Sequence, residues 1–171
     1  FSPHRIICTK YMQNGSLSQF LDFKTNPKNP SKTLSPTEKS IIIHGIASTF
    51  EYLHSQNILQ SPFDPSDVIL SDQFYPLVQL CCISQKIKKS NSRFFAPEYL
   101  SKGEYSEKVD VFVFGVILFE LATSTKFQSI ATINLKKDKM SNLANQIASE
   151  CCIENPQQRP TFNSIFKKLR N

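Results

Sequence analysis

Glycine and cysteine are both scarce in this sequence. Four glycines among 171 residues are too few for a flexible low-complexity chain. The five cysteines are an odd number, and no two stand at the Cys-x-x-Cys spacing with which thiolates share a zinc ion. A zinc-binding module is therefore not expected. We predict reduced, partly buried thiols at Cys8, Cys81, Cys82, Cys151 and Cys152.

A long apolar segment is also missing. The longest apolar run, Val111 to Ala122, is shorter than the roughly 20 residues of a membrane-spanning helix and includes Glu120. No basic and apolar leader stands at Phe1, so no membrane segment and a cytosolic location are expected. Because the chain starts at Phe1 and not at methionine, we expect further residues upstream.

Acidic residues are fewer than basic ones, 14 against 20, which gives a net charge of +6. Such a balance raises the question of a nucleic-acid or anionic membrane partner. The lysines cluster only weakly and lack interleaved aromatic residues, so a solvated basic surface is preferred and no nucleic-acid partner is expected. These clusters are Lys86, Lys88 and Lys89, and Lys136, Lys137 and Lys139.

What is present is the composition and length of one globular domain. Hydrophobic residues make up 40% and charged residues 20% of the chain, as in ordinary soluble proteins. A chain of 171 residues is long enough to bury a core. No internal repeat is visible.

Several helices are predicted from start signals and apolar spacing. Ser35-Pro36-Thr37-Glu38 combines an N-cap serine, a proline at the first helical position and a glutamate that bonds back. We expect a long helix from there to about His54. Ser106 can cap a second helix that is apolar on nearly every face, which is typical of a buried element. Two more helices are predicted at Ser141 to Cys152 and Thr161 to Leu169.

Extended segments are predicted in two places. Arg5 to Met12 is rich in β-branched and apolar residues and is expected to form a short strand. Ser16 with Gln19 predicts a capping box that opens a short helix. The stretch "QFYPLVQLCCI" predicts the second strand of a hairpin whose turn is "DQFY".

Four stretches, in this order and spacing, resemble the helical C-terminal lobe of a eukaryotic protein kinase of the tyrosine-kinase-like group. "TKYMQNGSL" is similar to the hinge, and "IIIHGIASTFEYLHSQNIL" to the helix that leads into the catalytic loop. "FFAPEYLSKGEYSEKVDVFVFGVILFEL" resembles the Ala-Pro-Glu end of an activation segment with the central helix, and "CCIENPQQRPTFNSIFKKL" resembles the closing Arg-Pro segment.

The resemblance implies a mainly α fold of the α+β superfamily: a kinase C-lobe-like helical bundle with a short N-terminal strand and a small β-hairpin. Residues 1–12 would be the last small-lobe strand and the hinge, and residues 13–171 the C-lobe. The hinge likeness makes Thr9, Tyr11 and Met12 the candidates for nucleotide contact. The resemblance to the kinase lobe further implies an ion pair between Glu98 and Arg159. It also implies that Asp110 holds the catalytic-loop backbone. An alternative for Asp110 is a helix-start aspartate that interacts with the macrodipole.

The catalytic motifs of the family are changed in this chain. The His-Arg-Asp motif falls on Gln60-Ser61-Pro62, and proline has no group that can accept a proton from the substrate hydroxyl. The Asp-Phe-Gly motif falls on Leu80-Cys81-Cys82, and leucine cannot ligate a magnesium ion. Asp67 stands at the position of the family's metal-binding Asn and keeps an oxygen donor, so it is the one weak metal candidate. Asp64 is also acidic and is a candidate for a substitute base, although it stands two residues beyond the position of the family's base.

These changes lead to the expectation that the chain is not an enzyme. The main hypothesis is a catalytically inactive kinase-like module that binds a protein partner, such as an active kinase, with no catalytic residue and no cofactor. The alternative is a fragment of a Ser/Thr or Tyr protein kinase whose small lobe lies upstream and which uses ATP and Mg²⁺. A third possibility is a product with a damaged fold.

The loop "KIKKSNSR" carries a separate hypothesis. In the family this segment is where phosphorylation acts, and a phosphate on Ser90 or Ser92 could pair with Lys88, Lys89 or Arg93. The alternative is an unmodified, solvated basic loop.

Overall fold

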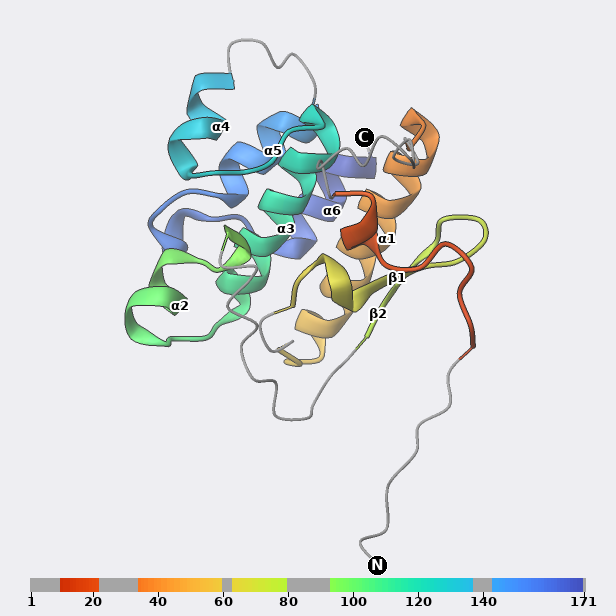
Figure 1. Cartoon of the computed structure of the whole chain (residues 1–171). Coiled ribbons are helices and arrows are strands. Elements are labelled where there is room, and N and C mark those ends of the chain that lie inside the picture. The colour runs from red at the N-terminus through yellow and green to blue at the C-terminus, as the bar shows by residue number, and fades with distance from the viewer. Residues whose placement is uncertain (1–9, 22–33, 60–62, 80–92, 137–142, 171) are drawn as a thin grey trace, which may run out of the picture.

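The computed structural model describes residues 10–21, 34–59, 63–79, 93–136 and 143–170, and Figure 1 draws the rest as a thin trace. The described part is a bundle of helices with one two-stranded antiparallel sheet beside it. The mainly α, kinase C-lobe-like fold with a small hairpin is therefore confirmed. The α-helices are α1 (Pro36–Ser55), α2 (Pro97–Lys102), α3 (Glu107–Thr123), α4 (Ile130–Lys136), α5 (Leu143–Cys151) and α6 (Phe162–Arg170). The short elements are η1 (Leu17–Gln19), η2 (Pro65–Asp67), η5 (Pro156–Gln158), β1 (Val68–Leu70) and β2 (Pro76–Val78).

Helix α1 begins where the sequence predicts. The backbone N–H of Ser35 donates to Glu38 Oε2 (2.7 Å), and the N–H of Glu38 donates to Ser35 Oγ (3.3 Å). This reciprocal capping box satisfies two donors that have no partner within the helix. The helix then buries one apolar face, made of Ile42, Ile43, Ile46, Ala47, Phe50 and Leu53.

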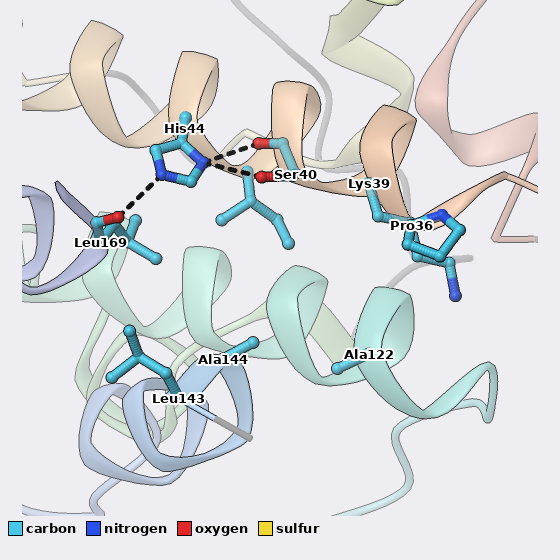
Figure 2. Close-up of a pocket in the computed structure, with 9 residues that line it drawn as sticks. Pro36, Lys39, Ser40, His44, Ala122, Leu143, Ala144 and Leu169 are labelled. Carbon is cyan, nitrogen blue, oxygen red and sulfur yellow. Dashed lines mark hydrogen bonds between the residues drawn. The ribbon is translucent and has the colours of Figure 1, made fainter. Parts of the chain in front are cut away.

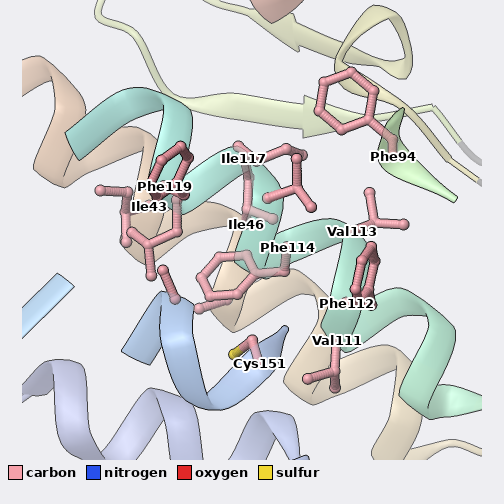
Figure 3. Close-up of a cluster of buried hydrophobic side chains, with 14 of the residues drawn as sticks. Ile43, Ile46, Phe94, Val111, Phe112, Val113, Phe114, Ile117, Phe119 and Cys151 are labelled. Atoms are coloured by element: carbon pink, nitrogen blue, oxygen red, sulfur yellow. The ribbon is translucent and has the colours of Figure 1, made fainter. Parts of the chain in front are cut away.

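Helix α3 is the centre of the bundle. Every residue from Val109 to Leu121 is buried, and Figure 3 shows side chains of α3 with those of α1 and Cys151 of α5 around them. Ser106 Oγ accepts the N–H of Lys108 (3.3 Å), so the predicted cap and the predicted burial are both confirmed. The helix buries two acidic side chains, Asp110 and Glu120, and both require partners.

The contact between α3 and α5 is unusually close at Gly115. A Cβ atom at this position would lie 2.6 Å from Cys151 Cβ and 2.7 Å from Cys152 Sγ. Because the first of these atoms is attached directly to the backbone of α5, the two helices would have to separate to admit a larger side chain.

We expect Gly115→Val to lower the free energy of unfolding by about 1 to 3 kcal/mol, the usual cost of overpacking a core. Urea unfolding of the variant should show a lower midpoint with an unchanged slope. Removal of Cys152 Sγ in a Cys152→Ala background should lessen the cost of Gly115→Val. An equal cost in both backgrounds would contradict this packing account.

The hairpin lies against α1, with Val68 opposite Val78 and Leu70 opposite Pro76 in the antiparallel register. This confirms the predicted hairpin. The predicted capping box at Ser16 is wrong: its backbone pairs with Ile69 of β1, and its hydroxyl lies 2.8 Å from Ser18 Oγ. Of the predicted strand at Arg5 to Met12, only residues 10–12 are described, and they form no strand.

Cys151 and Cys152 are buried free thiols, and burial raises the pKa of both well above the ordinary value. The other three cysteines lie outside the described residues. None of the helices in the described ranges combines the length and the apolar character that crossing a membrane requires.

Candidate functional site

The loop from Phe63 to Asp67 is fixed by its own residues. Phe63 is fully buried, and its ring centroid lies 4.5 Å from that of Phe50 on α1. Asp64 Oδ1 accepts the N–H of Ser66 (2.6 Å), and Asp67 Oδ2 accepts the N–H of Asp64 (2.9 Å). The two carboxylates therefore cap η2 reciprocally. Asp64 is buried, so its position favours a structural cap over the role of a substitute base.

Asp67 stands where the loop joins the hairpin. Its carbonyl oxygen accepts the N–H of Gln79 (2.8 Å), which places it beside the end of β2. The residue is only partly buried. Asp67 is therefore an oxygen-donor residue at the junction of the loop and the hairpin.

Asp110 joins three segments of the chain inside the protein. It is fully buried, and its Oδ2 lies 2.9 Å from Nε2 of His54 at the end of α1. Its Oδ1 accepts the hydroxyl of Tyr105, and burial and then the charge of Asp110 raise the pKa of that phenol. The predicted contact with the backbone of residues 60–62 lies outside the described residues.

Glu98 and Arg159 lie in direct contact. The Arg159 guanidinium donates from Nη1 to Glu98 Oε1 (2.6 Å) and from Nη2 to Glu98 Oε2 (2.9 Å). It also donates to the carbonyls of Ile153 (2.7 Å), Lys108 (2.9 Å) and Glu154 (3.1 Å). A bidentate pair of this kind fixes geometry as well as charge, and here it ties α2 to the start of α3 and to the segment before α6.

A second buried ion pair was not predicted. Arg93, which precedes α2, donates from Nε to Glu120 Oε1 (2.9 Å), and Glu120 is fully buried in α3. The same oxygen accepts the N–H of Phe127 (2.9 Å). A glutamate inside a helix that is apolar on nearly every face indicates that a partner must exist, but nothing in the spacing points to Arg93.

The remaining predicted site residues are less informative. Tyr11 is highly exposed, and the carbonyl of Met12 accepts the N–H of Gly15 (3.2 Å) in a turn. Within the five described ranges, no group of three or more His, Cys, Asp or Glu side chains could hold a metal ion. Outside these ranges lie Thr9, Pro62, Leu80, Ser90 and Ser92.

The site has three features that fit the resemblance to a kinase lobe: the loop capped by Asp64 and Asp67, the ion pair between Glu98 and Arg159, and the buried helix α3. A comparison with protein families agrees with this resemblance. The family described as "Protein tyrosine and serine/threonine kinase" matches residues 2–169. The chain belongs to the protein kinase family. It is 28% identical to serine/threonine/tyrosine-protein kinase HT1 of Arabidopsis thaliana, over 98% of this chain and 47% of that protein.

Other relatives in this kinase family give the same result. The receptor-like kinase TMK2 of Arabidopsis thaliana is 27% identical over 96% of this chain and 23% of its own length. The probable serine/threonine-protein kinase drkC of Dictyostelium discoideum is 27% identical over 98% of this chain and 25% of its own length. The chain thus spans less than half the length of the curated relatives it matches here.

The expectation that the chain is not an enzyme is wrong. The family is enzymatic, and the relatives are named as protein kinases. The changes at Pro62 and Leu80 concern single positions, whereas the likeness to the family extends over residues 2–169. A register that is inferred from flanking motifs does not fix which side chain approaches the reacting atoms.

Proposed function

We propose that this chain supplies the helical lobe of a protein kinase that transfers the γ-phosphoryl group of ATP to a hydroxyl group of a protein. The observation that carries the proposal is the family match over residues 2–169. The likeness to a serine/threonine/tyrosine-protein kinase favours the tyrosine-kinase-like group within the family. A protein partner and a cytosolic location stay predictions.

The geometry supports this function because buried contacts hold the elements around the loop of Asp67 in fixed positions. Catalysis of phosphoryl transfer consists mostly of positioning and charge stabilisation. Asp110 holds the end of α1, and the pair between Glu98 and Arg159 holds α2. The loop that carries Asp67 is attached to α1 through Phe63 and to the hairpin through the carbonyl oxygen of Asp67. A platform of this kind keeps a reacting group in one place.

The oxygen donors of the loop fit a magnesium ion bound together with ATP. Mg²⁺ is usually held by one or two carboxylates plus the phosphates of the substrate, with no need for a cage of protein ligands. Asp67 is the residue that would hold it, because it is only partly buried whereas Asp64 is buried. The ion would neutralise charge on the phosphates during transfer.

We expect the protein at its natural full length to incorporate phosphate from γ-labelled ATP into itself or a generic protein substrate when Mg²⁺ is present. Asp67→Ala should lower the rate about 10²-fold or more, since a metal ion supplies several kcal/mol of charge stabilisation. Asp72→Ala, which removes an exposed carboxylate from the hairpin turn, is the control and should leave the rate unchanged.

Two results would count against these assignments. Folded protein that incorporates no phosphate above the protein-free reaction would refute the proposed activity. An Asp67→Ala variant as active as Asp72→Ala would refute the role of Asp67 while leaving the activity itself in place.

A further inference from the structure

A pocket of about 390 Å³ opens between α1, the end of α3, the start of α5 and the end of α6. Figure 2 shows α1 along one side, with side chains of α3, α5 and α6 facing it. The volume lies within the usual range for small-molecule sites, roughly 300 to 1,000 Å³. No residue discussed above as part of the kinase site lines the pocket.

Most of the pocket wall is aliphatic. It is formed by Ile43 of α1, Ala122 of α3, Leu143 and Ala144 of α5, and Leu169 of α6. Leu143 is 44% exposed although it stands in a hollow. An apolar ligand body in this place would remove that surface from water, at a gain of about 25 cal/mol per Å².

The remaining wall, from α1, is polar and carries a positive charge. Lys39 is a partly buried residue, and its Nζ lies 3.3 Å from Ser124 Oγ; no acidic side chain in the described ranges forms a salt bridge with it. Ser40 and His44 continue the same side of the helix, one turn apart. A ligand that bears a single negative charge would complement this end of the pocket.

The pocket walls are held in place before any ligand binds. His44 Nε2 lies 2.9 Å from the carbonyl oxygen of Leu169, and Nδ1 lies 2.8 Å from the carbonyl oxygen of Ser40. Figure 2 shows this imidazole between α1 and α6. The contact ties the two helices together, so little ordering cost remains for a ligand to meet.

The pocket is also remote from the candidate kinase site. Lys39 and His54 stand 15 residues apart on α1, about 22 Å at 1.5 Å per residue. Asp110 contacts the His54 end of the helix. A molecule bound beside Lys39 would therefore not overlap a substrate bound beside Asp67.

We propose that this pocket binds a small organic anion that has an apolar ring body and a single carboxylate. The carboxylate lies against Lys39, and the ring body lies among Ile43, Leu143 and Leu169. The apolar wall sets the shape of the body, and the ammonium group of Lys39 sets the charge.

The test uses 2-naphthoate as the probe and the equally sized, neutral 2-naphthamide as its matched comparison. Isothermal titration of the folded chain should show that naphthoate binds more tightly than naphthamide by at least about fivefold, because charge-assisted hydrogen bonds are stronger than neutral ones. Lys39→Met should weaken naphthoate binding by about the same factor and leave naphthamide binding unchanged. Lys102→Met on α2, whose side chain is exposed, makes the same change in net charge and should alter neither affinity.

A steric variant tests the location. Ala122→Phe should abolish binding of both probes, whereas Ala122→Ser should preserve it, and both proteins are first checked for cooperative unfolding. In the unmodified chain, naphthoate should shift the methyl resonances of Leu143 and Leu169 and the ring resonances of His44. Equal affinity for the two probes, no binding of naphthoate, or shifts confined to other residues would overturn the proposal. If Ala122→Phe does not fold, the Lys39→Met affinities and the resonance shifts decide the question.

Discussion

Arg159→Ala is expected to lower the free energy of unfolding by about 3 to 5 kcal/mol, the usual cost of breaking a buried ion pair from one side. Arg159 is only 2% exposed, and its guanidinium donates to Glu98 and to three backbone carbonyls. Its removal would leave a carboxylate and several carbonyl groups without a donor, away from water. Urea unfolding monitored by circular dichroism measures the loss.

Two further variants isolate the cause of this loss. Arg159→Lys keeps the positive charge but cannot reproduce the planar fork, so its cost should lie between zero and that of Arg159→Ala. Arg170→Ala removes an exposed arginine from the end of α6 and should change stability by less than about 0.5 kcal/mol. An unchanged unfolding midpoint for Arg159→Ala would show that the pair contributes nothing to the fold.

Asp110→Ala is expected to be the next most damaging change, at no less than about 2 kcal/mol. It removes the acceptor for both Nε2 of His54 and the hydroxyl of Tyr105, and a buried donor without a partner costs about 1 to 3 kcal/mol. Because His54 lies in the last turn of the helix that leads to the loop of Asp67, the rate of phosphate transfer should fall together with the stability. Unfolding and kinase assays on the same preparation measure both effects.

A double-mutant cycle checks the assignment to Tyr105. In a Tyr105→Phe background the phenol hydroxyl is already absent, so Asp110→Ala should cost less there than in the unmodified protein. Asp110→Asn keeps one carbonyl acceptor and should cost less than Asp110→Ala. Additive costs of Asp110→Ala and Tyr105→Phe would show that the two side chains do not depend on each other.

The sequence predicted the elements whose signals are local. The capping box at Ser35 set the start of α1, and the all-round apolar pattern set the burial of α3. Helices α2 and α4 were not predicted, although Pro97 at the start of α2 and Gly103 just after it, at φ 70°, are ordinary boundary signals. At Ser16 the local signal failed, because the backbone there pairs with β1.

The site was only partly predictable because its contacts join distant residues. The pairing of Glu98 with Arg159 was expected from the resemblance to a family and not from spacing. His54 and Asp110 are 56 residues apart, and Arg93 and Glu120 are 27 apart. Periodicity in a sequence reports which face of a helix is buried, but it does not report which charged residue arrives from another segment.

The reciprocal cap between Asp64 and Asp67 bears on how this protein tolerates mutation. The path of the backbone through η2 is specified by hydrogen bonds among residues 64 to 67 and by the burial of Phe63. Each of these hydrogen bonds is accepted by the carboxylate of Asp64 or Asp67, so a substitution that removes either carboxylate removes one half of the cap.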